Sequence, residues 1–86
     1  MRDLEKVLKA VANRRRLAIL KYLKTDGPVS VGDIAEKIDL SFKATSKHLG
    51  ILSAVDIIEK NQKSTKIFYH LATTQKPVVK NLLALL

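Results

Sequence analysis

The sequence predicts a mainly α-helical domain with one small β-hairpin, an α+β fold in the order helix, helix, strand, helix, helix, strand, strand, helix. Apolar residues recur at helical spacing in five stretches, and residues able to cap a helix precede them. A run rich in β-branched and aromatic residues surrounds a polar tip near the C-terminal third. The 86 residues are enough for a single domain spanning residues 1–86.

The first two helices are predicted at the N-terminal end. Apolar residues recur every three or four positions from about Leu4 to Ala12, after Asp3, which can cap that helix. Asn13 is a good N-cap for a second helix, and Thr25–Pro28, with its Gly-Pro step, ends it. The second helix has an apolar face made of Leu17, Ile19, Leu20 and Leu23.

A third helix follows a short β-favouring stretch, Val29–Val31. Ser30 and Asp33 have the spacing of a capping box, in which the Ser and acidic side chains satisfy free N–H groups at the helix start. The third helix is therefore expected to continue to about Ile38.

A tight turn separates this helix from a fourth. Asp39 tolerates a left-handed backbone, and Ser41 can cap a helix that continues to about Ala54. Two helices joined by so short a turn predict a helix-turn-helix motif.

The remaining chain predicts a β-hairpin and a last helix. The β-favouring runs Asp56–Asn61 and Lys66–Leu71 flank a polar tip at residues 62–65. Either Thr73 or Thr74 can cap the last helix, whose first turn tolerates a proline. Its wide apolar stripe consists of Val78, Val79, Leu82, Leu83, Leu85 and Leu86.

The net charge of +8 makes polyanions the natural partners of this domain. The absence of cysteine excludes disulfides, thiolate zinc sites and thiol redox sensing. The N-terminal stretch carries several charges, and no apolar run reaches membrane-spanning length. We therefore expect a cytoplasmic, nucleoid-associated protein with no membrane partner.

The fourth helix is the main candidate for nucleic-acid contact. Thr45, Leu49 and Leu52 share one face and are expected to pack inward. The outward face then carries cations and a hydroxyl without an acid, which suits the major groove of double-stranded DNA, although the lysines could simply solvate a surface helix. The predicted contact residues are Ser41, Phe42, Lys43, Ser46, Lys47 and His48.

The hairpin tip is the second candidate. Three lysines lie within seven residues, as expected of a wing placed along a phosphate backbone, although a solvated turn would have the same composition. The predicted wing contacts are Lys60, Lys63, Ser64, Thr65 and Lys66.

Three consecutive arginines open the second helix, where the positive end of the helix dipole disfavours cations. Phosphate is a candidate anion for Arg14 and Arg15. Arg16 could equally pair within the fold with an acidic residue, namely Asp3, Glu5 or Asp33.

No metal, cofactor or catalytic site is expected. His48 and His70 are 22 positions apart, and neither has a metal-ligand companion at i+3 or i+4. His48 is better explained as a hydrogen-bond donor at the groove edge or as a packing residue, and His70 as a surface residue of the wing. Phosphate-binding loops and nucleophile motifs are also absent, which argues against an enzyme.

These segments together resemble the ArsR-type winged-helix repressors. Leu8–Leu20 resembles their opening helices, Val29–Glu36 the start of their third helix, and Leu40–Leu49 their recognition-helix signature. Lys66–Leu71 is similar to the second wing strand, so the resemblance covers about residues 4–72.

The resemblance implies a homodimer in which the first and last helices pack across a two-fold axis. Leaving the apolar side chains of the last helix in water would forfeit roughly 1.5 to 3 kcal/mol each, which also favours a covered surface. The alternative is a monomer whose last helix folds over its own core. The expected interface consists of Leu4, Val7, Leu8, Val11, Val78, Val79, Leu82, Leu83, Leu85 and Leu86.

The chain departs from the family at informative positions. Metal-sensing members carry cysteines in the third helix or His and acidic pairs in the last, and residues 29–33 and 76–81 supply neither. Phe42 replaces an often polar residue, and Ser64 replaces a frequent wing-tip glycine. We expect a sequence-specific repressor of a pseudo-palindromic operator without metal control. The alternatives are an architectural DNA-binding protein and a protein-interaction module.

Overall fold

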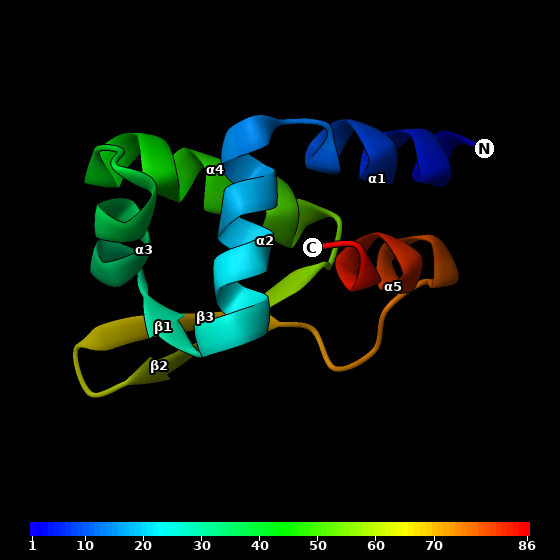
Figure 1. Ribbon diagram of the computed structural model, residues 1–86. Helices are drawn as coiled ribbons and strands as arrows, with labels where there is room; N and C mark the ends of the chain where they lie inside the picture. Colours follow the sequence, from blue (N-terminus) through cyan, green and yellow to red (C-terminus); the bar gives the residue numbers. More distant parts are fainter.

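The computed structural model describes residues 1–86 and contains five helices and three strands (Figure 1). The element order and the winged helix-turn-helix arrangement agree with the fold class predicted from the sequence. The elements are α1 (Arg2–Val11), α2 (Arg14–Asp26), β1 (Val29–Ser30), α3 (Val31–Ile38), α4 (Phe42–Ala54), β2 (Ile58–Lys63), β3 (Lys66–Leu71) and α5 (Pro77–Ala84).

Three predicted N-caps are confirmed. The side chain of Asn13 accepts a hydrogen bond from the Arg16 backbone N–H at 3.1 Å. Ser30 and Ser41 cap α3 and α4 in the same way, at 3.2 and 3.1 Å. Asp39 adopts the predicted left-handed backbone, with φ of 55°. Asp39 and Ser41 together fix the short turn that sets α4 against α3.

Two other predicted caps are wrong. Asp3 lies inside the first turn of α1, which begins after Met1 and has no side-chain cap. At the other end, α5 begins at Pro77 rather than after Thr73 or Thr74. The reason is tertiary, because hydrogen bonds from Thr73 to Glu59 and from Gln75 to Ile57 hold the linker before α5 in a bent, non-helical course.

The strands of the hairpin extend closer to its tip than predicted, and the turn is shorter. The antiparallel sheet has the order β1-β3-β2, and its ladder continues to the pair Lys63–Lys66. The turn is therefore only Ser64 and Thr65, with Ser64 at a φ of 58°. The first strand of the hairpin, β2, starts at Ile58 instead of the predicted Asp56, because Asp56 has a left-handed backbone that turns the chain out of α4.

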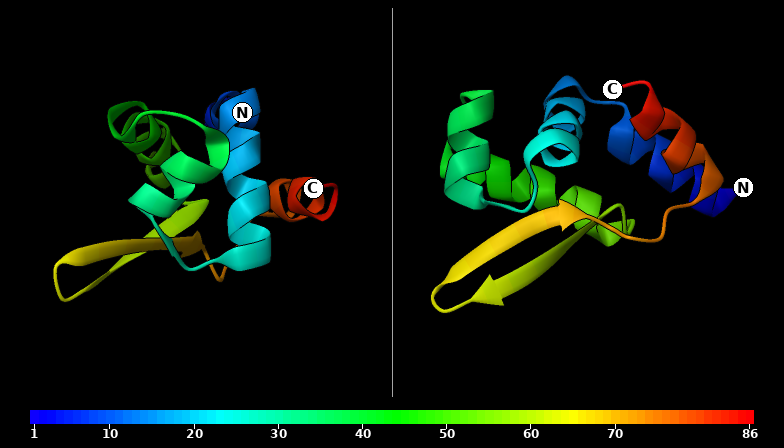
Figure 2. Two further views of the ribbon diagram at one scale, coloured as in Figure 1. Left: turned by 60° about the vertical axis from the view of Figure 1, so that its left-hand side comes forward. Right: turned by 60° about the horizontal axis from the view of Figure 1, so that its bottom comes forward.

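The core lies around α2, which contacts α1, α3, α4, α5 and β3. Ile19, Leu20, Ile34, Leu49 and Leu52 are completely buried there. The hairpin projects to one side of this core, whereas α1 and α5 lie across α2 from α3 (Figures 1 and 2). No helix is both long and apolar enough to span a membrane.

Candidate nucleic-acid interface

The inward face of α4 is as predicted. Thr45, Leu49 and Leu52 have no exposed surface, and each faces the core. The Thr45 hydroxyl oxygen is buried without a hydrogen-bond partner. This packing fixes the rotation of α4 about its axis, so the opposite face must point to solvent.

The solvent face of α4 presents cations and hydroxyls without any acid. Lys43, Ser46 and Lys47 are exposed, and the whole of α4 contains neither Asp nor Glu. Phe42 is 63% exposed at the N-terminal end of the helix. The oxygen of Ser41 accepts the Ala44 N–H, so its hydroxyl hydrogen can still be donated to an outside acceptor. This face can meet phosphates and base edges.

The hairpin carries the second group of predicted contacts. Lys60, Lys63 and Lys66 are all exposed, but the ladder places only Lys63 and Lys66 directly opposite one another. Lys60 pairs with Tyr69 and lies on the other face of the strand pair. Because like charges directly opposite repel, the Lys63–Lys66 pair favours an external anion at the hairpin tip.

Two of the three arginines at the start of α2 hydrogen-bond to the ends of other helices. The Nη1 of Arg15 donates to the carbonyl oxygens of Ile38 at 2.9 Å and Asp39 at 3.5 Å. The guanidinium therefore sits at the C-terminal end of α3, where the helix dipole favours a cation. Arg14 is exposed.

Arg16 makes the most extensive contacts of the three. It donates to the carbonyl oxygens of Ala10 and Lys9 at the end of α1, the latter at 3.3 Å. Its Nη1 also donates to Nδ1 of His48 in α4, at 3.1 Å. The predicted carboxylate partners of Arg16 are therefore wrong, because backbone carbonyls at a helix C-terminus take their place.

The His48 contact connects the start of α2 to α4. Burial, followed by the charges of Arg16 and Arg15, lowers the pKa of His48 from its ordinary value of 6.5. The neutral ring accepts at Nδ1, which leaves Nε2–H as a donor at the edge of the α4 surface. No local pattern could have revealed this contact, since its partners are 32 residues apart.

The two histidines are not brought together. His70 lies in the wing, where Nε2 is 3.4 Å from Asn61 Nδ2 and Nδ1 is 3.0 Å from the Leu71 carbonyl oxygen. No group of three or more His, Cys, Asp or Glu side chains is placed to hold a metal ion.

The predicted dimer residues divide into two sets. Val7, Val11, Val79 and Leu83 are buried in the core of the chain itself. By contrast, Leu4, Leu8 and Leu85 are 39%, 47% and 83% exposed, and Val78, Leu82 and Leu86 are half-buried. The inner part of each apolar stripe is therefore covered by the protomer, and the outer part is not.

The exposed apolar residues of α1 form one continuous surface, and the sequence pattern did not predict that Met1 belongs to it. Met1 is fully exposed and lines a shallow apolar groove of about 310 Å³ together with Leu4, Leu8 and Ala12.

The C-terminal end of α5 is fixed to α2 by Lys24, whose Nζ donates to the Leu83 carbonyl oxygen at 2.8 Å.

Comparison with known proteins agrees with this architecture. Residues 11–61 match the family model for a helix-turn-helix domain. The chain is 38% identical over 69 residues to the transcriptional activator HlyU of Vibrio cholerae, covering 80% of this chain and 63% of that protein. It is 40% identical over 68 residues to the transcriptional repressor SdpR of Bacillus subtilis, covering 79% of this chain and 74% of SdpR.

A solved structure shares the whole fold. The homodimeric winged helix-turn-helix DNA-binding domain of Mb0332 from Mycobacterium bovis, described as a possible ArsR-family transcriptional regulator, superposes with a TM-score of 0.83 at 31% identity. The match covers 98% of this chain and 74% of that one. Taken with the sequence matches, this places the chain in the ArsR-type family of winged helix-turn-helix transcriptional regulators.

Proposed function

We propose that the protein is a sequence-specific transcriptional repressor that binds a pseudo-palindromic operator as a homodimer, without metal control. The observation that carries this proposal is the acid-free solvent face of α4, which is set by the buried Thr45, Leu49 and Leu52. A helix with this face fits the major groove, where lysines reach guanine acceptors or phosphates. The proposed contacts in and beside α4 are Ser41, Phe42, Lys43, Ser46, Lys47 and His48.

The hairpin and α2 supply contacts outside the major groove in this proposal. The wing residues Lys60, Lys63, Ser64, Thr65 and Lys66 would lie along flanking phosphates. Arg14 remains a phosphate contact, and Arg15 would reach phosphate only with the guanidinium nitrogens that do not bind the end of α3. The whole of residues 1–86 would act as one DNA-binding domain with its dimer surface at the terminal helices.

The homodimer proposal rests on the exposed outer stripe of α1 and α5. Burying a fully exposed leucine side chain contributes about 1.5–3 kcal/mol. Leu85 would contribute close to this amount, and Leu4 and Leu8 less, because they are already partly covered. A two-fold axis through this surface would place two recognition helices in successive major grooves about 34 Å apart. The operator half-sites would then be about one helical turn apart.

Regulation without metal is proposed because the chain lacks cysteine and places its two histidines against different partners. Repression rather than activation is proposed by analogy with SdpR, which is named a repressor. HlyU is named an activator, so the direction of regulation needs a transcription assay in which operator position relative to the promoter is varied.

DNA selection from a random duplex library, followed by fluorescence anisotropy, tests the DNA-binding proposal. The selected sequences should contain two inverted half-sites, and affinity should fall steeply as salt rises. Lys43→Ala combined with Lys47→Ala should weaken binding by about 1,000-fold, since two contacts in each of two half-sites, each worth about 1 kcal/mol, sum to about 4 kcal/mol. Lys6→Ala combined with Lys76→Ala is the matched control, because it removes the same charge from exposed positions outside α4 and the wing.

Equal affinity for every duplex would contradict sequence-specific repression and would favour an architectural DNA-binding protein. Unchanged DNA affinity in the Lys43 and Lys47 variant would contradict the assignment of α4 as the recognition helix. Absence of DNA binding by the wild-type chain would favour a protein-interaction module.

A further inference from the structure

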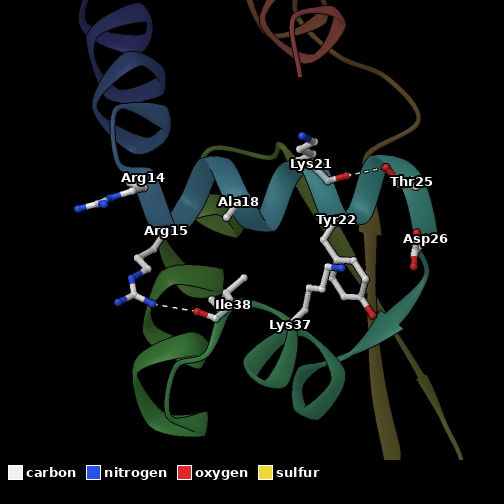
Figure 3. A pocket seen from close by; sticks show the side chains of 9 residues that line it. All are labelled: Arg14, Arg15, Ala18, Lys21, Tyr22, Thr25, Asp26, Lys37 and Ile38. Carbon is white, nitrogen blue, oxygen red and sulfur yellow. Dashed lines mark hydrogen bonds between the residues drawn. The ribbon is translucent and has the colours of Figure 1, made fainter.

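A pocket of about 580 Å³ lies between α2 and α3. Figure 3 shows α2 along one wall and α3 along the other, with α4 passing behind α2. None of its lining residues comes from α4, the hairpin, α1 or α5, so the pocket shares only Arg14 and Arg15 with the contacts proposed above. Its volume falls within the range of about 300 to 1,000 Å³ that is typical of small-molecule sites.

The charge of the walls favours an anion. Arg14, Arg15 and Lys21 from α2 and Lys37 from α3 line the pocket, and Asp26 is its single acidic lining residue. A concave surface with an excess of one sign of charge concentrates ions of the opposite sign. All five side chains are exposed, and of the four cations only Arg15 hydrogen-bonds to another part of the chain, at the end of α3.

The centre of the pocket offers apolar and aromatic surface. Ala18, Ile38 and the ring of Tyr22 line it, and the Lys37 ammonium lies 5.7 Å from the centroid of that ring. Burial and nearby carboxylates, Asp33 first, raise the pKa of the Tyr22 phenol, which therefore stays neutral. An aromatic ligand could stack or pack here, with the phenol available as a hydrogen-bond donor.

The two features follow one another along α2. Arg15 and Tyr22 are seven residues apart, which corresponds to about 10 Å along the helix axis. Figure 3 shows Arg14 and Arg15 at one end of the pocket and Tyr22 toward the other. A ligand of matching shape has an anionic head at the arginines and a one- or two-ring aromatic body over Ala18.

Arg15 also connects the pocket to the helix-turn-helix turn. Both of its hydrogen bonds to the end of α3 come from Nη1, so Nε and Nη2 are left for a carboxylate or sulfonate. The Asp39 carbonyl that it contacts belongs to the left-handed residue leading into α4. An anion that draws the guanidinium toward itself would loosen this contact.

We propose that the α2–α3 pocket binds a small aromatic carboxylate or sulfonate, and that its occupancy lowers affinity for DNA. The DNA part of this inference rests on the proposed function. An added anion reduces the positive charge that DNA meets, and it competes for Arg15 at the turn. By thermodynamic reciprocity, bound DNA lowers affinity for the anion by the same factor.

The probe for the test is naphthalene-1-sulfonate, a fluorescent anion that joins a sulfonate to a two-ring aromatic body. Fluorescence titration of the full chain without DNA should show saturable binding of one probe per chain. The largest amide shifts in a ¹⁵N–¹H correlation spectrum should map to residues around Ala18, Tyr22 and Ile38. No saturable binding, or the largest shifts on α1 and α5, would overturn the pocket assignment.

Two variants sharpen this test without touching the core. Ala18→Phe fills the exposed centre of the pocket and should weaken probe binding by at least about tenfold, equivalent to about 1.4 kcal/mol. Lys21→Glu reverses one wall charge and should have a similar effect. Lys6→Glu makes the same charge change on α1, outside the pocket, and should leave probe affinity within about twofold. Equal affinity in all three variants would overturn the assignment.

The effect of the probe on DNA affinity is measured in a separate experiment. Saturating probe should weaken DNA binding by the wild-type chain and not by Ala18→Phe. The same loss in both proteins, or no loss in either, would overturn the coupling. If the chain binds the probe at the pocket and binds no DNA, the proposed function fails while the pocket assignment stands.

Discussion

The α4–hairpin surface and the α1–α5 surface are both exposed, but they are built from opposite chemistry. The first presents lysines and hydroxyls over a buried apolar face, whereas the second leaves leucines such as Leu8 and Leu85 in water. A hydrated polyanion can satisfy the first surface, while the second gains by excluding water. This difference supports the proposal that one small domain binds two kinds of partner on two separate faces.

A carboxylate on the apolar surface should produce the largest effect. Leu8→Glu is expected to raise the dimer dissociation constant by more than about 100-fold, because an unpaired charge in a covered apolar contact costs several kcal/mol. Sedimentation equilibrium checks this, with Leu8→Met as the volume-conserving control. An unchanged oligomeric state in Leu8→Glu, with the fold retained by circular dichroism, would contradict the dimer surface.

A carboxylate on the α4 surface should have a comparable effect on DNA alone. Ser46→Glu is expected to weaken operator binding by about 30- to 100-fold, because a like charge placed against phosphate costs a few kcal/mol. Ser46→Ala should change affinity much less. Anisotropy measures both, and sedimentation should show wild-type dimerisation. If Ser46→Glu weakened the dimer and left DNA binding intact, the roles assigned to the two surfaces would be reversed.

Arg16 connects the two regions and should have an intermediate effect on stability. Arg16→Ala removes the donors to the end of α1 and to His48, which should lower the free energy of unfolding by about 1.5 to 3 kcal/mol. Arg14→Ala is the matched control, since Arg14 is exposed and should change stability by less than about 0.5 kcal/mol. Urea denaturation compares the two. Equal effects would show that Arg16 has no structural role.

The smallest effect concerns pH. Because the folded-state pKa of His48 is lowered, the unfolded state binds the proton more readily. The stabilising contribution of neutral His48 is complete above about pH 6.5 and is lost as pH falls through the lowered folded-state pKa. His48→Asn keeps an acceptor near Nδ1 and should lose less stability than wild type between pH 7 and pH 5. Identical pH dependence of the two proteins by thermal unfolding would contradict this.

Local patterns were enough to predict the fold and the inward face of α4. The caps at Asn13, Ser30 and Ser41 involve residues three positions apart, so the sequence contains both partners of each bond. The cap predicted at Thr73 or Thr74 failed because of long-range contacts from the linker, to Glu59 in β2 and to Ile57 just before it.

The candidate sites were less accessible to sequence reasoning because their contacts are long-range. Charge and periodicity predicted that Lys43 and Lys47 are exposed, and both are exposed in the structure. The same reasoning could not show that Arg15 and Arg16 bind the ends of other helices. It also could not show which residues of the apolar stripes are buried in the protomer and which are exposed. Val79 and Leu85 are both apolar, but Val79 is buried and Leu85 is exposed.

One titration tests the central claim most directly, namely that two copies of the chain read one specific operator. The selected duplex and a scrambled duplex of equal length are compared at physiological salt, with stoichiometry determined at concentrations well above the dissociation constant. We predict two chains per specific duplex and an affinity ratio of at least about 10³ over the scrambled duplex. A ratio near one, or one chain bound per operator, would contradict the account.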